Sequence, residues 1–140
     1  MHHYYHFYKP VGCVSARKDA EHTTVMDYFP SALRETLFPL GRLDKNTEGL
    51  LLITDDGKLN HRMLDPENNI EETPHTPATK CALWLTEGKR HQVKRMFEAV
   101  GCTVVWLRRT EFAGIALDET LSPGEYRPLN AEERTLLGVK

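Results

Sequence analysis

Several familiar catalytic motifs are absent from this sequence of 140 residues. It has no glycine-rich phosphate loop, no His-Glu-x-x-His pair and no serine in a nucleophile elbow. Its three cysteines lack the paired spacing of a zinc site or a disulfide framework, which favours reduced thiols. Its apolar runs are far shorter than the ~20 residues that span a bilayer, and no secretory signal pattern is evident. We therefore expect a cytoplasmic protein with no membrane association.

The composition is that of an ordinary folded protein. Hydrophobic residues make up 40% and charged residues 27%, and the length suits one domain over residues 1–140. The net charge of -2 conceals an uneven distribution of charge. Residues 88–110 are strongly basic and have Glu98 as their only acid. The basic residues of that stretch are Lys89, Arg90, Lys94, Arg95, Arg108 and Arg109. A basic face for nucleic acid is therefore compatible with the acidic average.

The order of predicted elements indicates an α+β fold. Strands are expected near residues 4–9, 49–54, 103–107 and 112–117, and short helices near 23–29, 58–65 and 130–137. The strand at 49–54 carries leucines on both faces, as a strand buried on both sides does. We predict a mixed, largely antiparallel β-sheet with flanking helices.

A basic helix is the clearest single element. Its apolar residues recur at i, i+3, i+4 and i+7, and Gly101 stands where a helix C-cap is expected. The four apolar positions are Val93, Met96, Phe97 and Val100. Cations crowd its N-terminal half, where the helix dipole disfavours them. Either an anion lies opposite them or they form a solvated basic face, and the spacing alone leaves both readings open.

Asp44 is the acid that most needs an explanation. It stands between Arg42 and Lys45 in "GRLDKNTEGLLLITDDGKL", directly before the buried strand. It could be a turn device, a helix cap, half of an ion pair or a nucleophile. A carboxylate beside a cation stays ionised, so it can attack an electrophilic carbon without a separate base. Taken by itself, a structural ion pair is the commoner explanation.

Four blocks of the chain, in order, resemble one enzyme family. They are "KPVG", "FPLGRLDKNTEGLLLITDDGKLNHRMLDP", "LTEGKRHQVKRMFEAVG" and "SPGEYRPL". Together they are similar to the signature blocks of the RsuA-type rRNA pseudouridine synthases. The wording "EGKRHQVKRMF" and "GEYRPL" is most similar to the enzymes that modify small-subunit rRNA. The resemblance implies the pseudouridine synthase catalytic fold and an isomerase that needs no cofactor and no metal.

The resemblance also implies roles for individual residues. Asp44 is the catalytic aspartate, which attacks the uridine at carbon 6 of the base or at the anomeric carbon of the ribose. The detached base then rotates and rejoins through carbon 5. Lys94 falls at the basic position that pairs with the aspartate in these enzymes. Arg42 falls where an arginine of related synthases helps to open the base stack.

The implied partner is ribosomal RNA, as structured RNA or a pre-ribosomal particle. The target uridine must be flipped out of its stack, which costs a few kcal/mol, and phosphate contacts can offset that cost. We expect at least two of four basic residues to face RNA: Lys89, Arg90, Arg108 and Arg109. Gln92 of the same block joins the predicted substrate-binding residues. A monomer without an obligate protein partner is expected.

Two departures from the family pattern stand out. Family members usually begin with a small RNA-binding domain, whereas this sequence starts at the catalytic block. No Lys-x-Tyr motif follows "HRMLDPENNIE", where the family has a tyrosine that packs on the target base. Either loop segments are missing near residues 71–82, which the intact blocks favour, or the enzyme is truncated or decayed.

Two other functions are compatible with the sequence. The chain could be a remnant of the same fold that binds RNA through its basic helix but cannot turn over. It could also hold a metal through His2, His3 and His6, although no acid or further ligand converges on them in the sequence.

Overall fold

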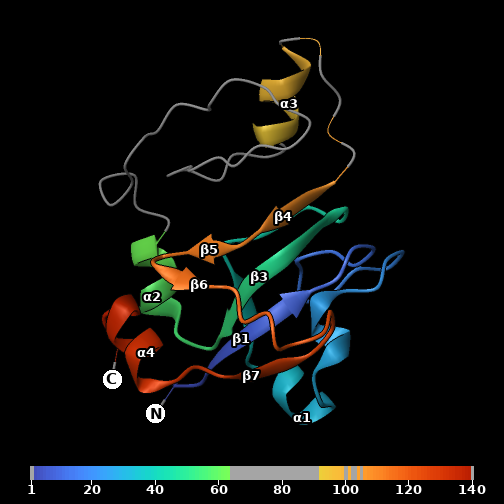
Figure 1. Cartoon of the computed structure of the whole chain (residues 1–140). Helices are drawn as coiled ribbons and strands as arrows, with labels where there is room; N and C mark the ends of the chain where they lie inside the picture. Colours follow the sequence, from blue (N-terminus) through green and yellow to red (C-terminus); the bar gives the residue numbers. More distant parts are fainter. Residues whose placement is uncertain (1, 64–91, 100, 102–103, 105, 140) are drawn as a thin grey trace.

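A five-stranded sheet forms the centre of the protein in a computed structural model that describes residues 2–63, 92–99, 101, 104 and 106–139 (Figure 1). Four strands run antiparallel to their neighbours, in the order β2 (Phe38–Leu40), β3 (Thr47–Thr54), β1 (Tyr4–Lys9) and β7 (Tyr126–Pro128). The fifth, β4 (Leu107–Arg109), pairs with β3 in parallel. The sheet is mixed and largely antiparallel, as predicted.

Strands β2 and β4 share the edge of β3 that faces away from β1. Leu40 at the end of β2 lies opposite Leu52, in the second half of β3. Thr47 at the start of β3 lies opposite Leu107 of β4. The connection between β2 and β3, residues 41–46, therefore lies beside β4 and carries Asp44. This segment is called the Asp44 loop below.

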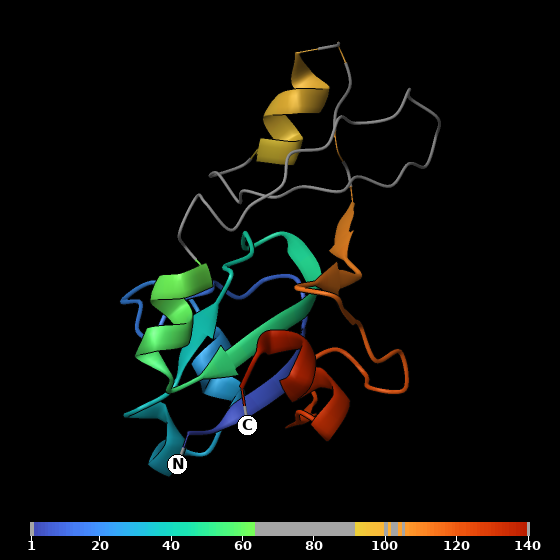
Figure 2. The same ribbon diagram turned by 90° about the vertical axis from the view of Figure 1, so that its left-hand side faces the viewer.

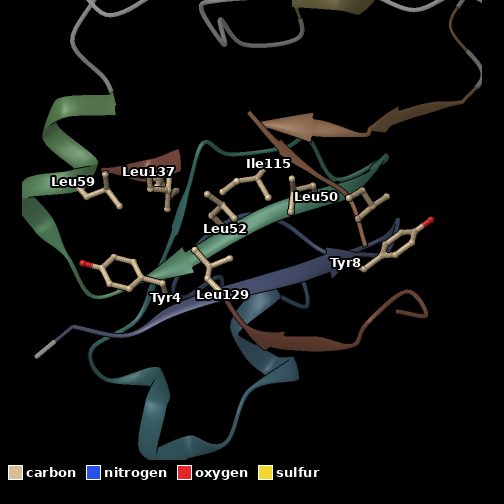
Figure 3. Packing of buried hydrophobic residues seen from close by; sticks show 10 residues of the cluster. Tyr4, Tyr8, Leu50, Leu52, Leu59, Ile115, Leu129 and Leu137 are labelled. Carbon is tan, nitrogen blue, oxygen red and sulfur yellow. The ribbon is translucent and has the colours of Figure 1, made fainter. Parts of the chain in front are cut away.

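Strand β3 is buried on both faces, which confirms the prediction from its leucines. Leu50 and Leu52 join the hydrophobic cluster on one face of the sheet, which Figure 3 shows. Leu51 and Ile53 join the cluster on the other face. All four side chains are at most 2% exposed. A strand enclosed in this way is a rigid support for the loop that precedes it.

Helices cover both faces of the sheet (Figures 1 and 2). On the face of Leu50, Leu59 of α2 (Gly57–Met63) and Leu137 of α4 (Ala131–Leu137) complete the cluster. On the opposite face, η1 (Val25–Tyr28) supplies Val25 and Met26, and α1 (Ser31–Arg34) follows it. Among the residues with described structure, no helix is both long and apolar enough to cross a membrane.

Two of the predicted short helices, near residues 23–29 and 130–137, are observed as η1 and α4. Thr24 caps η1 and forms a capping box with Asp27, and Asn130 forms the same box with Glu133 at the start of α4. Gly138 ends α4 in the left-handed conformation, at φ 74°. Both helices are confirmed.

Two predicted strands near the C-terminal end were wrong in their limits. Of the strand expected at 103–107, residues 103 and 105 lie outside the described residues, Val104 and Trp106 are not in a strand, and Leu107 begins β4, which includes Arg108 and Arg109. The strand expected at 112–117 is a hairpin of β5 (Glu111–Phe112) and β6 (Ile115–Ala116). Ala113 and Gly114 both have positive φ, at 54° and 82°, which turns the chain tightly between the two strands.

The basic helix is observed as α3 (Gln92–Glu98). Gly101 follows with φ 81°, and its N–H donates to the carbonyl of Glu98, in agreement with the predicted cap. Of the four predicted core positions, Met96 and Phe97 are partly buried. The side chain of Val93 and the whole of Val100 lie outside the described residues.

A buried polar network ties β1 to α4. His6 is fully buried, and its Nε2 accepts the backbone N–H of Asp118 at 3.0 Å. The proton of the neutral imidazole therefore lies on Nδ1, which is 3.2 Å from a carboxylate oxygen of Glu133. Arg127 donates to both Glu133 and Asp118, at 2.7 Å each. Burial and the charge of Arg127 lower the pKa of His6 below its ordinary 6.5.

This network predicts a loss of stability in mild acid. Because the pKa of His6 is lower in the folded state, its contribution is complete above about pH 6.5 and is lost as the pH falls through the folded value. Urea unfolding at pH 7.5, 6.5 and 5.5 should show the free energy of unfolding falling with pH. His6→Gln, which stays neutral, should flatten that fall. An unchanged slope in His6→Gln would contradict the assignment.

Candidate active site

Asp44 lies in a loop that is held by its main chain. The side chain of Asp44 is partly buried, and its carbonyl accepts the N–H of Thr47 at 3.0 Å. The N–H of Gly12 donates to the carbonyl of Lys45 at 2.8 Å. Both contacts set the path of the chain around Asp44 rather than its carboxylate.

Ser15 holds the residue before Asp44 at both backbone groups. Its hydroxyl donates to the carbonyl of Leu43 at 2.8 Å and accepts the N–H of Leu43 at 3.0 Å. The carbonyl of Ser15 in turn accepts a hydrogen bond from Nε of Arg42 at 2.8 Å. One serine therefore fixes two consecutive residues of the Asp44 loop.

Lys9 supports the loop from inside the protein. Its side chain is fully buried, and its ammonium donates to three carbonyls, those of Pro10 at 3.0 Å, Lys45 at 3.2 Å and Thr47 at 2.7 Å. Burial lowers the pKa of Lys9, and nearby acidic groups, including Asp44, oppose that shift. A lysine with all three donors engaged by carbonyls is a fixed positive charge beneath the loop.

Arg109 connects the loop to the sheet from the other side. Its Nη2 donates to the carbonyl of Gly41 at 2.6 Å and its Nε to the carbonyl of Leu50 at 2.8 Å. The guanidinium lies over the ring of Phe112, 4.4 Å from its centroid. Removal from water lowers its pKa to about 9, which still leaves it charged at neutral pH.

Two glycines make this close packing possible. A Cβ on Gly41 would lie 2.5 Å from the ring of Phe112, and one on Gly49 would lie 2.2 Å from the carbonyl oxygen of Arg109. Both glycines also have positive φ, at 71° and 119°. The start of the Asp44 loop and the first half of β3 are therefore shaped around Arg109.

The structure describes only some of the predicted site residues, and these differ in exposure and contacts. Arg42 is exposed and lies two residues before Asp44 in the same loop. Arg108 is partly exposed and pairs with Glu119 at 3.5 Å, whereas Arg109 makes the internal contacts described above. Lys89 and Arg90 lie outside the described residues, as do the side chains of Gln92 and Lys94. The predicted ion pair between Asp44 and Lys94 stays a prediction.

The histidines near the start of the chain do not form a common site. His2 and His3 both pair with Asp55, at 3.2 and 3.0 Å, whereas His6 points to Glu133. Over the part of the chain that the structure describes, no three His, Cys, Asp or Glu side chains are grouped to hold a metal. The described geometry gives the metal-protein hypothesis no support.

Sequence reasoning missed Lys9 and Ser15. Lys9 lies in the "KPVG" block without a predicted role, although a lysine directly before a strand-ending proline is unusual on a buried strand. Ser15 carries no signal of its own, because its importance lies in a contact with Leu43, 28 residues away. Lys9 and Ser15 both act on the main chain of the Asp44 loop.

Comparison with known families agrees with this geometry. The family model described as RNA pseudouridylate synthase matches residues 3–73, which include β1, the Asp44 loop and β3. The chain is 39% identical to an uncharacterised RNA pseudouridine synthase of Bacillus subtilis, over 92% of this chain and 70% of that protein.

Other relatives carry more specific names. Ribosomal small subunit pseudouridine synthase A of Pseudomonas aeruginosa is 39% identical, over 93% of this chain and 72% of its own. A crystal structure of a pseudouridylate synthase matches with a TM-score of 0.81 and 32% identity, over 98% of this chain and 74% of that one. The alignment with the Bacillus protein spans 168 positions, more than the 140 residues of the whole chain, so that relative has positions without a counterpart here.

Proposed function

Since the chain belongs to the RNA pseudouridylate synthase family, we propose that it converts a uridine of small-subunit ribosomal RNA to pseudouridine, with Asp44 as the nucleophile. The observation that carries the assignment of Asp44 is its loop, which is anchored by Lys9, Ser15 and Arg109. A fixed position speeds attack by a nucleophile, because less entropy is lost when it is aligned with the target carbon in the transition state.

The reaction needs no external reagent. The carboxylate of Asp44 attacks carbon 6 of the uracil or the anomeric carbon of the ribose, and the bond between N1 and that ribose carbon breaks. The base rotates and rejoins through carbon 5, and the bond between Asp44 and the substrate breaks, which frees the carboxylate. Overall, the glycosidic bond moves from N1 to carbon 5 and one proton moves from carbon 5 to N1. Atoms and electrons balance without a cofactor.

The surrounding cations are proposed to serve the RNA. Lys94 pairs with Asp44, and Arg42 helps to open the base stack around the uridine. Gln92, Lys89, Arg90 and Arg108 contact the substrate around the flipped nucleotide. Arg109 was predicted to join them, but its internal hydrogen bonds favour a positioning role for the Asp44 loop. Such cations compensate for unstacking through phosphate contacts.

The wider setting follows from the substrate. We propose that the chain works as a monomer on ribosomal RNA in the cytoplasm, and that residues 1–140 form one catalytic domain. We also propose that loop segments are missing near residues 71–82, a region that lies outside the described residues. The extra positions of the Bacillus relative show that it is longer than this chain within the aligned region.

The absence of a Lys-x-Tyr motif favours a second candidate, an RNA-binding remnant that cannot turn over. The test is to map pseudouridine in ribosomal RNA from cells with and without this protein. The proposal expects the loss of one modified position in small-subunit rRNA, restored by the wild-type gene. An unchanged map, together with RNA binding by the purified protein, would support the remnant instead.

A further inference from the structure

Trp106 is an aromatic side chain left open to solvent beside the candidate active site. It is 50% exposed, in contrast to the buried aromatics of β1 such as Phe7. The guanidinium of Arg108 lies over its ring, 5.4 Å from the centroid. An exposed indole with an arginine on it is a pair that proteins use to stack unpaired nucleobases.

The indole is held in place by a chain of hydrogen bonds that reaches the core. Its N–H donates to Oε1 of Glu48 at 2.5 Å, and Oε2 of Glu48 accepts the hydroxyl of Tyr8 at 2.9 Å. Tyr8 is 7% exposed and belongs to the core cluster shown in Figure 3. Fixing an exposed side chain costs conformational entropy, which a preorganised binding surface recovers when its ligand arrives.

The position of Trp106 relates it to Asp44. Trp106 directly precedes β4, whose first residue, Leu107, lies opposite Thr47. The N–H of Thr47 donates to the carbonyl of Asp44. The indole therefore lies at the end of β3 from which the Asp44 loop departs. This position makes the indole a candidate to contact RNA next to a nucleotide that is bound at Asp44.

We propose that Trp106, flanked by Arg108, forms a stacking platform for an unpaired base next to the target uridine. This platform rests on the proposed function, since its ligand is the RNA substrate. Flipping the uridine leaves adjacent bases without a stacking partner, and the indole replaces part of the stacking that they lose. The planar guanidinium of Arg108 adds a cation beside the same base or its phosphate.

Fluorescence anisotropy with a labelled single-stranded RNA loop of small-subunit rRNA tests the platform. Trp106→Ala should weaken binding by about 5- to 100-fold, the range expected for loss of one base–aromatic stack. Trp106→Phe should recover most of the affinity, because phenylalanine can stack although it lacks the N–H. Leu136→Ala, which removes a side chain that is 51% exposed on α4, is the matched control and should bind like wild type.

The outcomes separate the platform from the proposed function. Wild-type affinity in Trp106→Ala overturns the platform. So does an equal loss in Trp106→Ala and Trp106→Phe, because that result assigns Trp106 a structural role through Glu48. If the wild-type protein forms no pseudouridine but Trp106→Ala binds RNA more weakly, the platform is supported and the proposed function is rejected. Normal pseudouridine formation by the wild-type protein, with unchanged RNA binding in Trp106→Ala, supports the proposed function and rejects the platform.

Discussion

Replacing Asp44 with asparagine is expected to lower pseudouridine formation by at least about 10³-fold, the loss typical of removing a nucleophile. The amide keeps the shape of the carboxylate but cannot attack carbon. The loop should keep its course, because the contacts that hold it involve backbone groups of Leu43, Asp44 and Lys45. Single-turnover release of tritium from carbon 5 of labelled uridine in small-subunit rRNA measures the reaction directly.

RNA binding and stability should change little in the same variant. We expect the affinity of Asp44→Asn for the RNA to stay within a few fold of wild type. Glu132→Gln, the same chemical change on the exposed surface of α4, is the control and should react like wild type. Turnover by Asp44→Asn at more than a tenth of the wild-type rate would show that another residue is the nucleophile.

The main features of the sheet could be predicted from local patterns. The leucines of β3 showed that it is buried on both faces, and local sequence patterns indicated the short helices near residues 23–29 and 130–137. Periodicity and capping are local properties, so a sequence states them directly. The position of Asp44 directly before a buried strand could also be predicted from local patterns, and the structure confirms it.

The roles of Arg108 and Arg109 could not be predicted in this way. They belong to the four basic residues of which at least two were expected to face RNA, and the predicted strands at 103–107 and 112–117 left both between two strands. In the structure they lie within β4, and successive residues of a strand point to opposite sides. Arg108 lies over Trp106, whereas Arg109 reaches back to Gly41. Because the strand includes both arginines, their side chains point to opposite sides and make different contacts.

The support of the Asp44 loop was also beyond local reasoning. Lys9 and Lys45 are separated by 36 residues, and Arg109 and Gly41 by 68. Each contact joins a charged donor to a backbone carbonyl. Every residue has such a carbonyl, so the sequence does not show which one will accept the hydrogen bond. The charged residues could be seen in advance, but their acceptors depend on the completed sheet.

Replacing Arg109 is expected to have the second largest effect on activity, because it loosens the Asp44 loop without touching the substrate. Arg109→Lys keeps the charge, but a single ammonium cannot donate to Gly41 and Leu50 in the geometry of a guanidinium. We expect kcat to fall by about 10- to 100-fold, since a displacement of about 1 Å is enough for such a loss, with KM nearly unchanged. Arg109→Ala should in addition lower the free energy of unfolding by about 2–4 kcal/mol, because two carbonyls lose a charged donor.

Arg34→Lys is the matched control for a general loss of arginine hydrogen bonds. Arg34 also donates to two carbonyls, those of Phe29 at 2.9 Å and Asp27 at 3.4 Å, but it does so at the end of α1. Steady-state rates are compared at a temperature where thermal unfolding shows all variants to be folded, so that a change in kcat reports the site. If Arg109 acts on the Asp44 loop, kcat falls in Arg109→Lys and stays at the wild-type value in Arg34→Lys. A rise in KM with unchanged kcat in Arg109→Lys would instead return Arg109 to the RNA-binding surface, because a phosphate contact contributes equally to the bound substrate and to the transition state.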